Sequence, residues 1–328
     1  MSGQGATEPL RSLVDARANH MATDWDNLTI PVPWFIGRRL VRPALEDLVP
    51  YIDWTPFFSA LGLEGRFPAI LNHAEHGRHV RELYGAVQQT LTAIVRDKRL
   101  TATGIYGFWP ANTEGDDIVV YQDDARRVVL ARFHMLRQQM AGTGPSRSLA
   151  DFIAPRTSLA PDYIGAFAVT SAVGLDALVD EYEARQDEDH VIISRAIADR
   201  LTESFAAFLH AQARQDWGYA RGEALSPDDL IEERHRGIRP VFGGPACPDT
   251  SEKASLFDLL GAPAAGIVLT DSFGTMPVTS SSGLYFSHPE AGYFDVGRIG
   301  RDQVEDYRSR KGISVDEVER RLSRNLGY

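Results

Sequence analysis

One segment of the chain combines residue types suited to binding a small charged molecule. Residues 237–248 read GIRPVFGGPACP and contain an arginine, two adjacent glycines, three prolines and the only cysteine of the chain. Prolines fix φ and remove amide donors, while glycines allow backbone conformations closed to other residues. We therefore expect an ordered loop with exposed backbone groups, in which Arg239 offers a planar set of donors for a carboxylate or a phosphate.

A helix is predicted directly after this loop. Asp249 is placed to cap it, Glu252 stands three residues later as a capping-box partner, and Gly261 follows the apolar run at 256–260. Because helix N-termini favour negative groups, loop and helix start together suggest a small zwitterionic or anionic ligand. Read alone, the same pattern is also that of a proline-rich connector between two elements.

The nucleophile and metal patterns are weak. Cys247 precedes a predicted helix N-terminus, where a thiolate is favoured, but the sequence places no general base beside it, and loop packing is the simpler interpretation.

His73, His76 and His79 recur at every third position. Structural metal sites usually recruit a ligand from another element, so we interpret these histidines as a solvated face and expect no metal. No phosphate loop, serine elbow or zincin helix occurs, and we expect no catalytic residue on this chain.

Three carboxylates could serve either a structural role or contact with a ligand. Asp53 lies inside the aromatic segment YIDWTPFF, where it either caps the following turn or contacts a ligand. Glu203 borders an apolar helical stripe, and Glu233 lies six residues before Arg239. Each of the last two is a plain surface carboxylate if no ligand binds.

The elements that would position these residues point to an α+β fold. Strands are predicted in hairpins and helices in runs, without regular alternation, which favours an antiparallel sheet. Residues 1–35 are polar and proline-interrupted and are predicted to form an N-terminal arm, followed by a single domain at 36–328. Helices are expected at 10–18, 44–52, 72–98, 176–214 and 249–260, with two more after 300; strands are expected at 117–121, 126–133, 163–170, 284–287 and 293–296.

Composition excludes several classes of protein. The 328 residues are 43% hydrophobic, enough for a substantial core, and the formal net charge of -11 argues against nucleic-acid or anionic-membrane partners. A single cysteine excludes an intrachain disulfide and points to a reducing compartment. No signal-peptide core and no apolar run of about 18 residues is found. We expect a soluble cytoplasmic protein.

Long sequence blocks carry a family resemblance over practically the whole chain. They are YIDWTPFF (51–58), GDDIVVY (115–121), DYIGAFAVT (162–170), ADRLTESFAAFLH (198–210), GIRP with PACP (237–248), YFSHPE (285–290) and RDQVEDYRSRKG (301–312). With these blocks in this order, the chain resembles the C-terminal activation domain of cobalamin-dependent methionine synthase.

The resemblance implies a fold and a function. The family domain is a C-shaped α+β structure on a twisted antiparallel sheet, which binds S-adenosylmethionine and closes over a cobalamin module oxidised to cob(II)alamin. Flavodoxin or a comparable reductase supplies the electron, and S-adenosylmethionine supplies the methyl group. The ligand positions implied here are Asp53, Glu203, Glu233, Arg239, the backbone at Val241 and Gly243, and Tyr293.

The chain also departs from the family pattern. Gly244 stands where a tyrosine is usual, and Thr250 replaces a histidine near the cobalamin side. Loss of the tyrosine ring removes an aromatic contact of about 1 kcal/mol, unless Phe242 supplies a ring from the neighbouring position. The alternative function is therefore a non-catalytic docking or chaperone subunit for a corrinoid protein that has lost S-adenosylmethionine binding.

The cobalamin-ligating sequence pattern of methionine synthase is not found in these residues. We expect a stand-alone reactivation subunit of a split methionine synthase, part of a methyltransferase but without a complete active site. Its expected partners are a cobalamin-binding subunit and a reductase.

Overall fold

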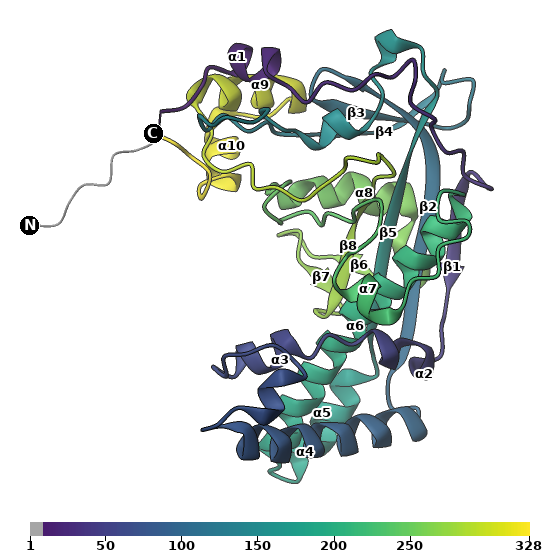
Figure 1. Ribbon diagram of the computed structural model, residues 1–328, viewed down its shortest axis with the longest axis vertical. Coiled ribbons are helices and arrows are strands. Elements are labelled where there is room, and N and C mark those ends of the chain that lie inside the picture. Colours follow the sequence, from purple (N-terminus) through teal and green to yellow (C-terminus); the bar gives the residue numbers. More distant parts are fainter. Residues whose placement is uncertain (1–8) are drawn as a thin grey trace, which may run out of the picture.

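The structure is a computed structural model that describes residues 9–328, so the first eight residues of the predicted arm lie outside the described residues. The chain forms a C (Figure 1). Long strands make its back, a lobe of helices makes one arm, and a mixed lobe with α9 and α10 makes the other. The helices are α1 (Leu13–Ala18), α2 (Leu45–Leu48), α3 (Thr55–Ala60), α4 (Gly77–Arg96), α5 (Leu175–Ala184), α6 (Glu188–Asp216), α7 (Pro227–Ile231), α8 (Lys253–Leu260), α9 (Arg301–Lys311) and α10 (Val315–Arg321).

An antiparallel sheet with the order β4-β3-β2-β5-β8 forms the back of the C, and β1 pairs with β2 beside this path. A separate pair joins β6 to β7. The predicted α+β architecture with an antiparallel sheet is confirmed. The strands are β1 (Gly37–Val41), β2 (Thr101–Glu114), β3 (Asp117–Tyr121), β4 (Val129–His134), β5 (Asp162–Val173), β6 (Val268–Leu269), β7 (Thr275–Met276) and β8 (Ser280–Tyr285).

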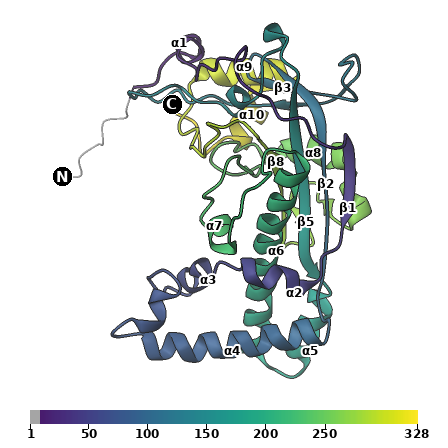
Figure 2. The same ribbon diagram turned by 45° about the vertical axis from the view of Figure 1, so that its right-hand side comes forward.

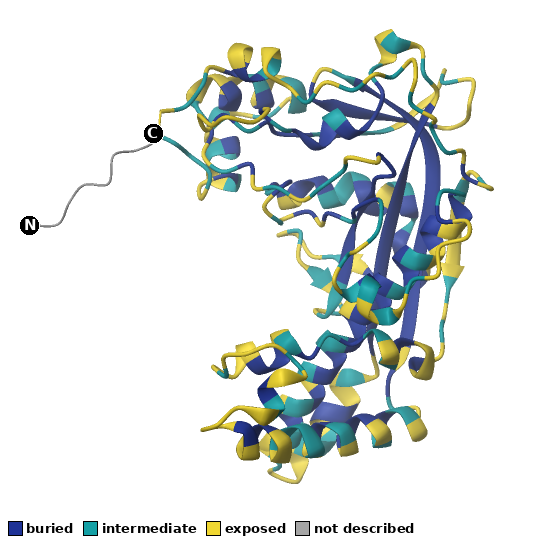
Figure 3. Cartoon of the chain, in the orientation of Figure 1, coloured by how far each residue is buried: buried dark blue, intermediate teal, exposed yellow. Residues whose placement is uncertain are grey.

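The two central strands are buried along almost their whole length (Figure 3). Alternate side chains of β2 and β5 enter two different cores. Phe108 and Phe167 belong to the core shared with α4 and α6, whereas Trp109 and Ala168 belong to the core shared with α8. A strand covered on both faces has no polar side, which is why β5 contains an almost continuous apolar run.

Helix α6 joins the helical lobe to the sheet. It has 29 residues, so at 1.5 Å per residue it is about 44 Å long. Its first turn is capped by Asp187, whose carboxylate accepts from the amide of His190 at 3.2 Å. It packs against α4 and α5 near its start and against β5 and β8 further on (Figure 2). One helix therefore carries side chains from the helical lobe into the centre of the molecule.

The described part of the N-terminal arm packs along the domain. The amide of Leu13 donates to Oδ2 of Asp302 at 2.5 Å, and the indole of Trp217 donates to the carbonyl of Pro31 at 3.2 Å. These contacts join the arm to α9 and to the end of α6. The boundary between arm and domain at residue 35 remains a prediction.

Two sequence expectations are wrong. Strand β2 was not predicted, because Gly104, Gly107 and Pro110 resemble turn signals. At Gly107 a Cβ would lie 2.2 Å from the carbonyl oxygen of Gly37 on β1, so this glycine permits close strand pairing. The predicted hairpin of 284–287 with 293–296 does not form: β8 pairs with β5, and 293–296 contains no strand.

The expectation for the first long helix needs a smaller correction, since α4 starts at Gly77 after a short 3-10 turn at 69–72. The hairpin of β3 and β4 and the two closing helices are confirmed. Among the described helices, none combines the length and the apolar character that a membrane crossing requires.

Candidate functional site

Five of the seven predicted site residues line one cavity of about 250 Å³. Its lining residues come from α6, β5 and β8, from the glycine-rich loop 237–248 and from Glu233 and Tyr293. Helix α6 and strands β5 and β8 meet in the middle of the C (Figure 1). The lining residues are Phe167, Glu203, Glu233, Arg239, Val241, Ser281 and Tyr293.

Residues 238–241 pair alongside β8, and this pairing holds Arg239 at the cavity. The amide of Ile238 donates to the carbonyl of Phe286 at 3.2 Å, and the amide of Phe286 donates back at 3.1 Å. The amide of Leu284 donates to the carbonyl of Pro240 at 3.1 Å. In extended backbone, alternate side chains point to opposite sides, so Arg239 and Val241 line the cavity while Ile238 is buried in the core.

Arg239, Glu233 and Tyr293 form a connected network. The backbone amide of Arg239 donates to the Tyr293 hydroxyl oxygen at 3.0 Å, and that hydroxyl donates to Oε1 of Glu233 at 3.1 Å. The same Oε1 lies 3.2 Å from Nη1 of Arg239. Tyr293 is 45% exposed, but its concave surroundings reduce the hydration of the phenol and, with the nearby Glu233 carboxylate, raise the pKa of Tyr293 to about 12, so its hydroxyl stays protonated at neutral pH.

Glu203 brings a second carboxylate to the cavity from α6. Its side chain reaches solvent, yet the concave surroundings reduce the hydration of the carboxylate and raise its pKa, while Arg200 and Arg239 oppose this shift. The cavity thus holds a guanidinium, two carboxylates and a phenol. Such a set suits a ligand that carries both a carboxylate and a positive charge.

Asp53 and Gly243 are not among the residues lining this cavity. Oδ1 of Asp53 accepts from the amide of Thr55, the first residue of α3, at 2.9 Å, although Trp54 and not Asp53 is the N-cap residue of this helix. Gly243 sits in the adjoining turn with φ +92, and its amide donates to the carbonyl of Cys247 at 2.9 Å. Ligand contacts at both positions remain predictions.

The glycine-rich loop is ordered by its own hydrogen bonds. The amide of Gly244 donates to the carbonyl of Val241 at 3.1 Å, and the amide of Cys247 donates to the carbonyl of Gly244 at 3.2 Å. The thiol of Cys247 is buried, which raises its pKa, and it also donates to the carbonyl of Val241 at 3.1 Å. This cysteine serves loop packing, since a buried neutral thiol is a poor nucleophile.

Phe242 does not replace the missing tyrosine ring. It is 3% exposed and stacks on Phe133 with ring centroids 5.6 Å apart, inside the core on the other side of the loop from Val241. Thr250 lies against the turn, because a Cβ at Gly243 would come within 2.9 Å of its methyl group. The loop is therefore held by its own hydrogen bonds and by packing of Phe242 and Thr250, with no aromatic side chain at position 244.

The expected cap at Asp249 is confirmed, whereas the capping box with Glu252 and the position of this helix start beside the ligand cavity are wrong. Asp249 caps a short 3-10 turn at 250–252 through the amide of Ser251, but Glu252 forms no capping box. Instead Lys311 binds both carboxylates, 2.6 Å from Oδ2 of Asp249 and 2.5 Å from Oε1 of Glu252. The side chain of Lys311 therefore occupies this helix start, and neither Asp249 nor Glu252 lines the cavity.

Phe167 and Ser281 line the cavity without having been predicted. They lie on β5 and β8, and the pairing of these strands brings them together. No local pattern marks either residue, because their position depends on strand pairing over more than 100 residues of sequence.

The three histidines around the start of α4, with His73 and His76 before the helix and His79 on it, form no metal site among the described residues. His73 and His76 stack at 5.3 Å, and Nδ1 of His73 accepts from the amide of Glu75 at 3.3 Å. Across residues 9–328, no group of three or more histidine, cysteine, aspartate or glutamate side chains could hold a metal ion.

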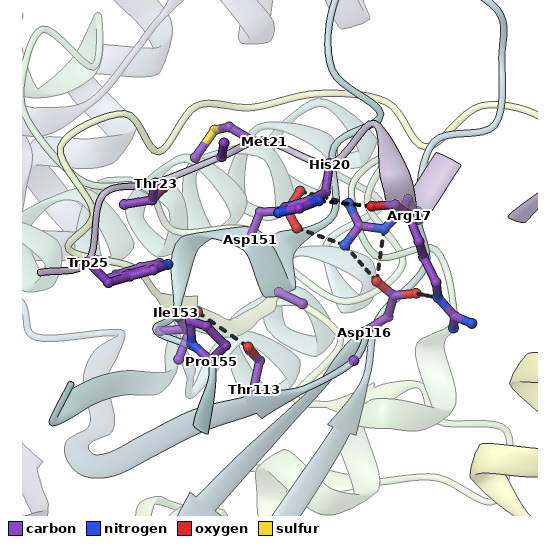
Figure 4. A pocket seen from close by; sticks show the side chains of 14 residues that line it. Arg17, His20, Met21, Thr23, Trp25, Thr113, Asp116, Asp151, Ile153 and Pro155 are labelled. Atoms are coloured by element: carbon purple, nitrogen blue, oxygen red, sulfur yellow. Dashed lines mark hydrogen bonds and ion pairs between the residues drawn. The ribbon is translucent and has the colours of Figure 1, made fainter. Parts of the chain in front are cut away.

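A second cavity of about 360 Å³ lies beneath the N-terminal arm (Figure 4). Its charged groups satisfy one another: Arg137 binds Asp116 at 2.6 Å and Asp151 at 2.7 Å, and Arg17 binds Asp116 at 2.8 Å. This cluster anchors the arm to the domain and leaves little charge for a ligand.

Comparisons with known proteins agree with this architecture. The family model for the activation domain of vitamin B12-dependent methionine synthase matches residues 44–312. A crystal structure of the MetH reactivation domain bound to AdoHcy is 46% identical in sequence, with 98% of this chain and 99% of that chain covered and a TM-score of 0.94. The predicted C-shaped fold is thereby confirmed, and the chain belongs to the family of activation domains of vitamin B12-dependent methionine synthase.

Proposed function

We propose that this chain binds S-adenosylmethionine in the cavity around Arg239 and supports the reductive methylation of cob(II)alamin carried by a partner subunit of methionine synthase. The observation that carries the proposal is the convergence of Arg239, Glu203, Glu233 and Tyr293 on one cavity. The similar solved domain, which is bound to AdoHcy, supports the same ligand class, because AdoHcy is S-adenosylmethionine without its transferred methyl group.

The charges of the site match the amino-acid end of this ligand. Arg239 binds its carboxylate with two parallel donors, and Glu203 and Glu233 face its ammonium and sulfonium charges. The cavity of about 250 Å³ is smaller than the roughly 300–1,000 Å³ usual for whole ligands, so it receives one end of the molecule. The adenosine extends along the loop backbone at Val241 and Gly243, and Asp53 supplies a further carboxylate.

The chain's contribution to the reaction is binding and orientation. The partner's cobalamin accepts one electron from flavodoxin or another reductase and then the methyl group of S-adenosylmethionine. This chain holds the ligand's carboxylate and ammonium, so that the methyl group is presented at a fixed position. The carboxylates stabilise the sulfonium before transfer and lose that interaction when the neutral thioether forms.

The second candidate is a docking or chaperone subunit that no longer binds S-adenosylmethionine. It is favoured by one observation: Gly244 supplies no ring to the site, and Phe242 is buried elsewhere. An aromatic contact contributes about 1 kcal/mol, so its loss weakens binding severalfold without abolishing it. The retained charged network is therefore the stronger argument.

A reconstitution experiment separates the two candidates. This chain is mixed with a separately produced cobalamin-binding module of methionine synthase in the cob(II)alamin state, a reductase and S-adenosylmethionine, and methylcobalamin is followed by absorbance. The proposal predicts methylation that requires this chain and is lost with Arg239→Ala. Co-precipitation that Arg239→Ala leaves unchanged, with no methylation by the unmodified chain, would establish docking alone.

A further inference from the structure

Buried polar groups of His210, Tyr285 and His235 lie in a layer behind the cavity, and the function described above gives these three residues no role. Both ring nitrogens of His210 and the hydroxyl of Tyr285 are buried and find no hydrogen-bond partner among the described residues. The same holds for Nε2 of His235 and Nη1 of Arg239, although Nη1 lies at ion-pair distance from Glu233. Buried polar groups in native proteins are almost always hydrogen-bonded, so several such atoms in one place indicate bound water or a ligand.

These groups are arranged as a stack of rings that starts at the cavity. Phe167 lines the cavity and stacks on Tyr285, with ring centroids 4.7 Å apart and planes 13° apart. Tyr285 stacks in turn on His210 at 5.0 Å and 4°, and His235 meets His210 edge to face at 5.0 Å. The stack connects the floor of the cavity with the inner face of α6, on which His210 lies two turns beyond Glu203.

Both histidines in the layer are neutral. Burial, assisted by the positive charge of Arg239, holds the pKa of His210 well below its usual range. Burial and the neighbouring Arg214 lower the pKa of His235 to about 4. A neutral imidazole offers one donor and one acceptor, so each ring can accept a hydrogen bond from a guanidinium or from water beside it. A protonated His210 would instead repel Arg239.

We propose that His210 is a positioning residue: with Tyr285 it holds water that accepts a hydrogen bond from Nη1 of Arg239, and this bond aims the guanidinium at the carboxylate of the ligand. The inference rests on the proposed function. Water bridges of this kind are nearly as favourable as direct hydrogen bonds, and a guanidinium fixed before binding loses less freedom when the ligand arrives. A purely structural role would not distinguish one end of the ligand from the other.

The test uses two ligands that differ at that end. S-adenosylhomocysteine carries the carboxylate and the ammonium, whereas 5′-methylthioadenosine lacks the amino-acid part. Calorimetry measures both affinities for the full chain and for His210→Phe and Tyr285→Phe, which remove the polar atoms and keep a ring. His79→Phe, on an exposed position of α4, is the matched control.

We expect both variants to weaken S-adenosylhomocysteine binding about tenfold, the effect of one well-made hydrogen bond, and to leave 5′-methylthioadenosine unchanged. Equal losses for both ligands, or no loss for either, would overturn the inference. Failure of the unmodified chain to bind S-adenosylhomocysteine would instead refute the proposed function. If His210→Phe does not fold, the affinities of Tyr285→Phe for the two ligands test the inference, because this variant deletes only one hydroxyl group.

Discussion

The substitution Arg239→Met tests the charged network most sharply, because the structure predicts a large effect on binding and a small effect on folding. The Arg239 side chain is 16% exposed and lies 3.2 Å from Glu233, whose side chain is 35% exposed. A partly exposed ion pair contributes about 0–1 kcal/mol to folding. Glu233 also keeps the hydrogen bond from Tyr293 when Arg239 is removed, so its carboxylate is not left without a partner.

The binding effect follows from the donors that the ligand loses. Each charge-assisted hydrogen bond contributes about 1.5–3 kcal/mol, and water replaces part of the loss on the open side of the cavity. We therefore expect a total loss of about 3 kcal/mol, which raises the Kd for S-adenosylmethionine roughly 150-fold.

Isothermal calorimetry and thermal unfolding measure the two effects separately. Arg308→Met makes the same chemical change at an exposed pair with Glu305 on α9 and is expected to leave binding unchanged. An Arg239→Met variant that binds within about threefold of the unmodified chain would refute the assignment of Arg239 to the ligand's carboxylate.

Three further predictions concern other parts of the molecule. The reduced hydration of the Glu203 carboxylate in its concave surroundings raises its pKa. The protonated form of Glu203 therefore contributes stability that is fully present below the ordinary pKa of 4.5 and is lost as pH rises through the folded-state pKa. Glu203→Gln should therefore raise Tm at pH 7.5 but not at pH 4, while weakening S-adenosylmethionine binding at pH 7.5; a lower Tm at pH 7.5 would contradict this. Arg137→Met leaves the buried Asp151 without its ion-pair partner and Asp116 with Arg17 alone, and should cost about 3–5 kcal/mol in urea unfolding. Arg156→Met, at an exposed pair, should cost less than about 1 kcal/mol, and similar costs for both variants would refute the buried-pair argument. Cys247 should react with a thiol reagent only after unfolding, and Cys247→Ser should retain ligand binding; rapid labelling of the native chain would show an accessible thiol.

The sequence predicted the elements whose pattern is local. The hairpin of β3 and β4 has β-branched residues on both sides of a polar turn, and α6 shows a continuous apolar stripe. Strand β2 was not predicted, because its glycines and its proline resemble turn signals. Only the structure shows that Gly107 is needed for the close approach of β1.

The site was predictable only in part. The family motifs pointed to Arg239 and Tyr293, but the contact between them depends on the pairing of residues 238–241 alongside β8. The sequence also placed a helix N-terminus beside the ligand, and the structure fills that position with Lys311 from α9. The polar layer at His210 could not be predicted from the sequence, because the residues that contact His210 come from distant segments of the chain.

One measurement tests the central proposal most directly: calorimetric titration of the unmodified chain with S-adenosylmethionine up to millimolar concentration. The retained network of Arg239, Glu233 and Tyr293 predicts one ligand per chain, with affinity that weakens as pH falls and Glu203 becomes protonated. No heat and no thermal shift at millimolar ligand would contradict the proposal and leave docking on a cobalamin protein as the function.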